Sequence, residues 1–304
     1  MQKKSLLCAG ALCLVLACNK KDYNSASQGY PSIDSVYNEM GAKTQSFTVN
    51  AATGASFYGK GGARFIFPPN AFTKNGNPVT GDVQVQVAEY PKISDMIFSK
   101  VLTVSNGQPL VSGGEVYVDA RQNGEKLDIS GTFQVNIPQR STADSAMQLY
   151  TAKDYDSTKS SAINWQLDPT GSVAPVSKDT LAVRTTGTMG NYHNADRGWG
   201  QAGTSLQTFY LRLGSPKGIS NKLSAYAVYD NYFMVVPLTE GIKDAMITVT
   251  TVPNIPVHFI VMGVIDGDFY AGILPATPMT GIYYNLNLNK TKPDDFRALI
   301  DEIK

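Results

Sequence analysis

Cysteine and histidine are scarce in this chain of 304 residues, which contains three Cys and two His. All three cysteines precede residue 19, so we expect no disulfide in the folded part of the chain. A zinc site needs three or four nitrogen, sulfur or oxygen ligands. His193 and His258 are far apart in sequence and belong to no short ligand motif. The sequence therefore predicts no metal site, although turn acids such as Asp266 and Asp268 leave a calcium site open as an alternative.

An excess of basic charge is also missing. Lys and Arg total 26 and Asp and Glu total 25, and charged residues make up only 17% of the chain. Proteins that bind nucleic acid depend on clustered positive charge to neutralise phosphates. We therefore expect no nucleic-acid partner. After residue 18, no apolar run reaches the roughly 20 residues that a membrane-spanning helix needs.

The first residues carry a targeting pattern. Lys3 and Lys4 precede a short apolar stretch, and Ala17 stands directly before Cys18. This pattern resembles the lipobox of bacterial lipoproteins. The resemblance implies a signal peptide over residues 1–17, acylation of Cys18, and attachment to the outer membrane at its periplasmic or cell-surface leaflet. An ordinary secretory peptide cleaved elsewhere, or an uncleaved anchor, is the alternative.

Residues 18–45 are polar and rich in Ser, Asn, Lys and Gly. Such a composition predicts a flexible tether that separates a folded region from the lipidated Cys18. A poorly patterned first strand is the alternative.

Residues 46–140 have the pattern of short strands. Apolar and polar residues alternate over 82–87, 115–119 and 133–137, as in strands with one buried face. Asn-Gly pairs at 75–76, 106–107 and 123–124 favour tight turns, and Gly113-Gly114 is a further turn signal. No crossover helix is indicated, so the pattern predicts a β-sandwich.

Four segments of this region carry a resemblance. They are residues 62–72 (GARFIFPPNAF), 75–81 (NGNPVTG), 85–90 (VQVAEY) and 110–124 (LVSGGEVYVDARQNG). They resemble the N-terminal β-domain of Bacteroidetes lipoproteins, which is similar in pattern to the ZU5 module of ankyrins and netrin receptors. ZU5 domains are interaction modules, so the resemblance implies binding or scaffolding.

Residues 141–205 are less patterned and predict an irregular connecting segment. Asn194-Ala195-Asp196-Arg197 is similar to an aromatic–Asn–x–Asp–Arg phrase of the same bacterial group, although the flanking aromatic residues are each displaced by one position. We take this segment as the possible ligand or partner contact; aromatic packing between domains and a local loop histidine are the alternatives. The candidate residues are Tyr192, His193, Asn194, Asp196, Arg197 and Trp199.

Residues 206–304 predict a second β-domain with a C-terminal helix. Strands are expected over 209–213, 224–229, 247–252 and 282–288, with a buried central strand at 257–264 that pairs with 269–273. Phe296, Leu299, Ile300 and Ile303 recur at helical spacing and predict a short amphipathic helix. The expected fold class is thus all-β, with two antiparallel β-sandwich domains in tandem.

No Gly-x-Ser-x-Gly elbow or phosphate-binding loop is present. We therefore predict a non-catalytic cell-envelope lipoprotein without a cofactor. It would bind a protein or glycan partner, or scaffold an envelope assembly. An envelope glycan hydrolase is the alternative, because the two carboxylates of such enzymes need not be close in sequence.

Overall fold

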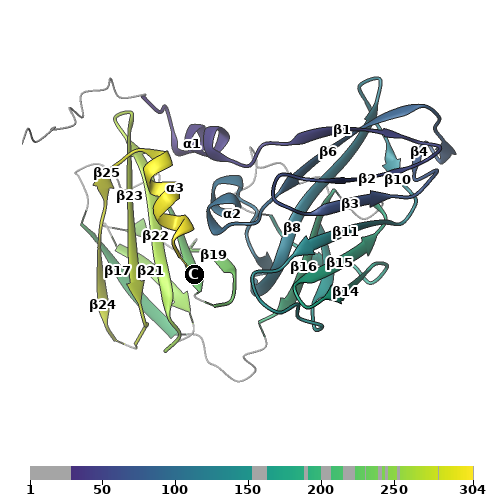
Figure 1. Ribbon diagram of the computed structural model, residues 1–304. Helices are drawn as coiled ribbons and strands as arrows, with labels where there is room; N and C mark the ends of the chain where they lie inside the picture. Colours follow the sequence, from purple (N-terminus) through teal and green to yellow (C-terminus); the bar gives the residue numbers. More distant parts are fainter. Residues whose placement is uncertain are drawn as a thin grey trace, which may run out of the picture.

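The computed structural model describes residues 29–152, 163–187, 191–199, 207–214, 223–229, 231–238, 242–243, 246–251, 254–279 and 281–303. Within these ranges the chain is mostly β and forms five sheets and three helices (Figure 1). Cys18 and the expected signal peptide over residues 1–17 lie outside the described residues. None of the helices in the described part has the length and apolar character that crossing a membrane requires.

The first β-unit is built from three sheets (Figure 1). The largest follows the order β1 (Gln45–Asn50), β6 (Asp82–Glu89), β8 (Gln108–Gln122), β16 (Tyr192–Gly198), β12 (Gln148–Ala152) and β13 (Gln166–Leu167), with β7 (Val104–Ser105) and β9 (Glu125–Lys126) beside β8. The second follows the order β14 (Ser172–Ser177), β15 (Thr180–Thr185), β11 (Phe133–Pro138), β3 (Arg64–Phe67) and β2 (Ala55–Tyr58). The smallest contains β10 (Asp128–Ile129), β4 (Phe72–Lys74) and β5 (Asn77–Pro78).

The core of this unit lies between the two larger sheets. Val83, Val85 and Val87 of β6 belong to the same buried cluster as Phe65 of β3 and Val135 of β11. Because successive side chains of a strand point to opposite faces, the period-two pattern places all three valines on one side of the sheet. The predicted strands at 82–87 and 133–137 are confirmed.

The first unit continues to residue 198, so the expected boundary near 140 is wrong. Five strands, β12 to β16, fall within the segment that we expected to be an irregular connection. β16 lies in the middle of the largest sheet, between β8 and β12. Several polar residues of β16 are buried, so both faces of the strand are covered. The sequence therefore lacks the alternation of apolar and polar residues that identifies a strand with one face in water.

The second β-unit has two sheets (Figure 1). Leu211 and Ile247 of one sheet share a buried cluster with Phe259 and Val261 of the other. The pairing of β17 with β24 is parallel, whereas the other strand pairs described are antiparallel. The strands are β20 (Ile242–Lys243), β21 (Met246–Thr251), β17 (Gln207–Gly214) and β24 (Tyr283–Asn287) in one sheet, and β19 (Met234–Pro237), β18 (Leu223–Tyr229), β22 (Val257–Ile265), β23 (Asp268–Ala276) and β25 (Asn289–Lys290) in the other.

Three helices lie between the two units: α1 (Ile33–Met40), α2 (Ile93–Ser99) and α3 (Pro293–Asp301) (Figure 1). The helix α3 confirms the prediction from C-terminal spacing. The tether expected over 18–45 is interrupted by α1, which begins with a capping box between Ser32 and Ser35. The interpretation of 46–140 as free of helix is also wrong, because α2 lies within it. Both helices are only two turns long and gain their stability from buried contacts.

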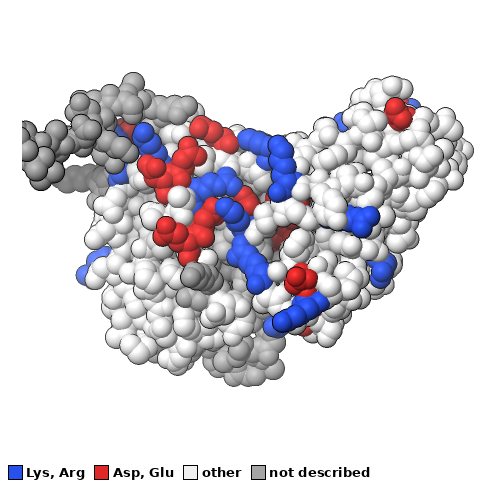
Figure 2. All heavy atoms as spheres, in the orientation of Figure 1, with Lys and Arg blue, Asp and Glu red and all other residues white. Residues whose placement is uncertain are grey.

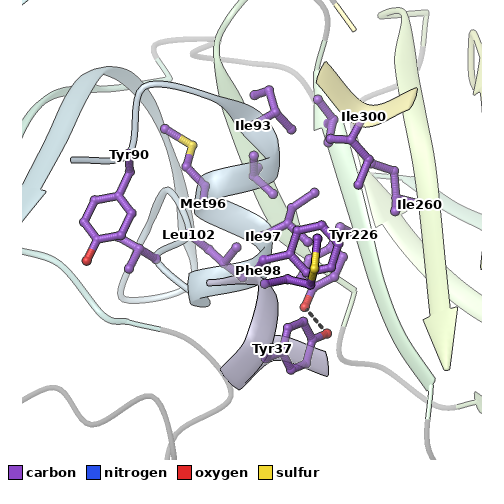
Figure 3. Close-up of a cluster of buried hydrophobic side chains, with 14 of the residues drawn as sticks. Tyr37, Tyr90, Ile93, Met96, Ile97, Phe98, Leu102, Tyr226, Ile260 and Ile300 are labelled. Atoms are coloured by element: carbon purple, nitrogen blue, oxygen red, sulfur yellow. Dashed lines mark hydrogen bonds between the residues drawn. The ribbon is translucent and has the colours of Figure 1, made fainter. Parts of the chain in front are cut away.

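A shared apolar core joins the units through these helices (Figure 3). It combines Leu102 of the first unit, Tyr226 and Ile260 of the second, and Phe98 and Ile300 of α2 and α3. The segment after α2 also bonds directly to β19 of the second unit. The Thr103 amide donates to the Val235 carbonyl at 3.1 Å, and the Val235 amide donates to Thr103 Oγ1 at 2.8 Å. The two units are thereby packed together rather than linked only by loops.

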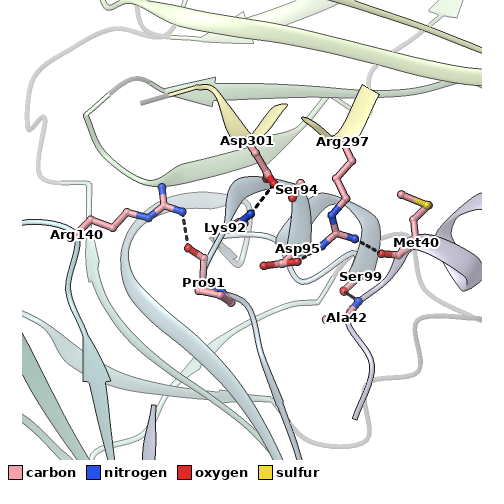
Figure 4. A network of polar contacts seen from close by, with 10 residues as sticks. All are labelled: Met40, Ala42, Pro91, Lys92, Ser94, Asp95, Ser99, Arg140, Arg297 and Asp301. Carbon is pink, nitrogen blue, oxygen red and sulfur yellow. Dashed lines mark hydrogen bonds and ion pairs between the residues drawn. The ribbon is translucent and has the colours of Figure 1, made fainter. Parts of the chain in front are cut away.

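Polar contacts surround this core (Figure 4). The Arg297 guanidinium of α3 pairs with Asp95 of α2 and donates to the Met40 carbonyl of α1 at 2.6 Å. Lys92 Nζ pairs with Asp301 at 2.8 Å. Figure 2 shows charged side chains gathered around these helices, with few on much of the rest of this face. The helices are therefore held to one another by charge as well as by apolar packing.

Candidate functional site

A cleft of about 840 Å³ lies where the two β-units meet. The first unit contributes the Gly113–Glu115 part of β8 to its lining, together with residues 137–142, which are the end of β11 and the segment that follows it. The second contributes Tyr229, Tyr232 and Phe233 at the β18–β19 turn. Ligand sites in proteins are commonly of this size and frequently lie between domains.

A β-bulge in β8 shapes one wall of the cleft. Asn194 of β16 is opposite Glu115, but Asp196 is opposite Ser112, so β8 has an extra residue between these pairs. Gly114 within the bulge has a φ of +124°, and a Cβ there would lie 2.6 Å from Ile137 Cγ2. The extra residue brings Ser112 and Glu115 to the same face, where both reach Asn194. The turn expected at Gly113-Gly114 is therefore a bulge inside a 15-residue strand.

Four buried polar side chains form one cluster at this bulge. Asn194 Nδ2 donates to Glu115 Oε1 at 3.2 Å and to Asp196 Oδ2 at 2.6 Å. Ser112 Oγ donates to Asn194 Oδ1 at 3.1 Å, which fixes the orientation of the amide. Glu115 is 2% exposed and Asp196 is 0% exposed. Glu115 Oε2 and Asp196 Oδ1 have no hydrogen-bond partner among the described residues.

Burial controls the protonation of this carboxyl pair. Loss of water around Glu115 raises its pKa well above the usual value, and the neighbouring Asp196 raises it further. Burial likewise raises the pKa of Asp196 well above its usual value. Two buried carboxyl groups that share one amide disfavour simultaneous ionisation. The pair thus titrates as a unit and holds at least one proton more readily than exposed acids do.

The exposed side of the cleft carries two arginines with partners. Arg197 Nε donates to Asp144 Oδ2 at 2.7 Å. The amide of Ala146 and this arginine lower the pKa of Asp144. The Arg140 guanidinium lies 3.8 Å from the centre of the Phe233 ring and donates to the Pro91 carbonyl. The cation–π contact joins the first unit to the turn of the second.

The structure brings only part of the predicted contact set to the cleft. Asn194 and Asp196 belong to the buried cluster, and Arg197 lines the cleft. His193 is separated from them because β16 points it to the opposite face, where its ring packs edge-on against Phe133 at 5.3 Å. Burial in that core lowers the pKa of His193 to about 4.

The two predicted aromatic contacts pack within the protein. Tyr192 lies against Tyr117, with ring centres 4.9 Å apart. Trp199 lies 4.9 Å from Tyr229 and 5.9 Å from Tyr232 of the second unit, measured between ring centres. Trp199 therefore supports two tyrosines that line the cleft, which agrees with the alternative of packing between domains.

The sequence interpretation missed Glu115, Asp144, Tyr232 and Phe233 as site residues. Glu115 is one of the polar residues of the alternating segment 115–119, and its face of β8 is not in water because the core between the units covers it. The pair Gly113-Gly114 inside an apolar strand was the available signal, because glycine within a strand often marks a bulge or a close approach.

No family model matches this chain, and no curated protein or solved structure shows significant similarity to it. Within the described residues, no group of three or more His, Cys, Asp or Glu side chains could hold a metal ion. The cleft offers three kinds of group: Glu115 of the carboxyl pair, the pair of Arg197 with Asp144, and aromatic side chains.

Proposed function

We propose that this chain is a lipid-anchored, non-catalytic binding protein of the bacterial cell envelope, and that its partner occupies the cleft between the β-units. The observation that carries the proposal is the cleft itself, in which apolar walls surround a few polar groups. This combination is typical of binding sites, because apolar area supplies affinity and a few polar groups supply orientation.

The rigid connection between the units supports a binding role. The walls of the cleft come from both units, and the shared core of the three helices fixes their separation. A site that is already formed loses less conformational entropy when a partner binds. Binding can then be specific without closure of one unit on the other.

The remaining parts of the proposal follow from the sequence. Residues 1–17 would be removed as a signal peptide, and Cys18 would carry the lipid at the outer membrane. The polar residues before α1 would act as a tether that lets the rest of the chain extend away from the membrane. We further propose that the two β-units are tandem β-sandwich domains and that the first is ZU5-like, a relationship that favours a protein or glycan partner.

The test is site-specific photo-cross-linking of the lipidated full chain in intact cells. A photoreactive phenylalanine analogue replaces Tyr232 in the cleft or, as the control, Tyr58, which is 65% exposed on β2. The proposal predicts a discrete protein or glycan adduct from position 232 alone, and its loss in Cys18→Ser. Equal adducts from both positions, or none from position 232, would contradict it.

A second candidate is supported by the acids of the cleft. Glu115 has a raised pKa and Asp144 a lowered pKa, and both line the cleft. Carboxyl groups whose environments separate their pKa values are the arrangement that glycan hydrolases use for a general acid and its partner. This alternative predicts that the purified chain degrades an envelope polysaccharide, and that Glu115→Gln and Asp144→Asn each abolish the activity.

A further inference from the structure

One residue that lines the cleft has a buried carboxylate oxygen without a partner among the described residues. Glu115 lines the cleft, and only 2% of its surface is exposed. Its Oε2 nevertheless has no hydrogen-bond partner among the described residues. A buried acceptor without a partner is unfavourable by about 1–3 kcal/mol. A ligand that donates a hydrogen bond to this oxygen would remove that penalty on binding.

The surroundings of Glu115 restrict what the donor can be. Asn194 directs its NH₂ group, and not its oxygen, toward both acids, so the unpartnered oxygens of the cluster are Glu115 Oε2 and Asp196 Oδ1, fewer than the roughly six oxygen ligands that a divalent cation takes. Asp196 places a second acid beside Glu115. A donor that also carries positive charge is favoured here, because it would compensate the ionised form of the pair.

The walls near Glu115 restrict the rest of the ligand. On the side of β8 that Glu115 faces, the cleft is lined by apolar side chains of the core between the units, namely Tyr90, Ile93 and Val228. Such walls fit an alkyl stem better than a ring covered with hydroxyl groups, which would lose hydrogen bonds to water. Lysine combines these properties, since it carries an ammonium group on a four-carbon stem.

We propose that the cleft binds a primary alkylammonium group, such as a lysine side chain of the partner, and that this group donates to Glu115 Oε2. The inference rests on the proposed binding function and specifies the chemistry of that site. Arg140 and Arg197 do not take this role, because one stacks on Phe233 and the other pairs with Asp144.

Binding should compete with protonation of the carboxyl pair. Asn194 and Ser112 bond to the pair and favour its ionised form, and the neutral phenols of Tyr90 after β6 and Tyr150 of β12 also face it. The ammonium group favours ionised Glu115, whereas a proton neutralises it. The affinity for the ammonium group should therefore rise between pH 5 and pH 8, while the amine itself stays protonated.

The experiment is a titration of the full chain, labelled with ¹⁵N at asparagine, with n-butylammonium chloride. n-Butanol in matched sodium chloride serves as the neutral probe of the same shape. We expect saturable shifts of the Asn194 side-chain amide with the ammonium probe only, with an affinity that rises with pH. Glu115→Gln should weaken binding at least about tenfold, whereas the matched Glu125→Gln, at an exposed site, should leave it unchanged.

Each outcome bears on the proposal. Equal shifts with both probes would overturn the preference for an ammonium group but leave binding in the cleft intact. No shift with either probe would overturn the inference, and cross-linking from position 232 would then decide the proposed function separately. Wild-type affinity that does not change with pH would also overturn it, even if Glu115→Gln did not fold.

Discussion

The phenol oxygens of Tyr37 and Tyr226 lie 2.7 Å apart, although 189 positions separate these residues in the chain. The first belongs to α1 and the second to β18, and both side chains are buried in the core between the units (Figure 3). One hydrogen bond thus joins α1 to the second β-unit.

Tyr37→Phe should lower the free energy of unfolding by about 1–2 kcal/mol, because it removes this bond and leaves Tyr226 with one partner fewer. Urea denaturation measures the change, with Tyr58→Phe at an exposed site as the control. The double variant Tyr37→Phe/Tyr226→Phe should lose less than the sum of the single variants. Strictly additive losses would show that the two hydroxyl groups are not coupled.

Two glycines with positive φ should respond differently to alanine. Gly114 (φ +124°) lies in the bulge against Ile137, whereas Gly124 (φ +82°) has nothing within 4 Å of the position of an added Cβ. Gly124→Ala should destabilise the protein by about 1 kcal/mol through backbone strain alone. Gly114→Ala adds a clash with Ile137 and should lower the free energy of unfolding by about 3 kcal/mol or more. Thermal or urea unfolding measures both changes. Similar losses in both variants would contradict the close contact at Ile137.

Glu115→Gln should change how stability depends on pH. The pKa of Glu115 is higher in the folded than in the unfolded chain, so above the ordinary pKa of glutamate the folded state binds more protons. The free energy of unfolding of the wild type should therefore fall as pH rises. Relative to the wild type, that of the variant should increase by up to about 1.4 kcal/mol per pH unit. Urea denaturation between pH 5 and pH 8 measures the difference. Parallel curves for the two proteins would contradict the raised pKa.

His193→Leu should have the opposite dependence on pH. Burial lowers the pKa of His193 to about 4 in the folded chain, against about 6.5 in the unfolded chain. Below pH 6.5 the unfolded state binds more protons, so wild-type stability falls by about 3 kcal/mol on reaching pH 4. The variant should lack this loss, whereas His258→Leu should retain it because His193 remains. Denaturation at pH 7 and pH 4.5 distinguishes the two.

Local patterns predicted much of this fold. The valines at 83, 85 and 87 identified β6, and continuous apolar character identified β22 as a strand with neighbours on both sides. Asn123 and Asp266, each followed by glycine, adopt the positive φ that tight turns require. Phe296 and Ile300 are buried as the helical spacing of the last segment predicted.

The parts that were not predicted depend on distant contacts. β16 carries Asn194 and Asp196 at positions that are completely buried, and no local pattern separates such residues from polar residues in a loop. The helices α1 and α2 are short and gain most of their stability from packing on other segments. The cleft itself combines residues near positions 115, 140 and 232, which a sequence pattern does not connect.

The contacts of α1 also set an order of assembly for the newly made protein. Tyr37 and Met40 are among the earliest of the described residues to be synthesised, but they bond to Tyr226 and Arg297. The helix α1 can make these contacts only after residues 189 and 257 positions further along the chain have been synthesised, and such distant contacts favour slow folding. A chain interrupted before α3 would lack Ile300 and Arg297, so we expect the core between the units to form only after α3 has been synthesised.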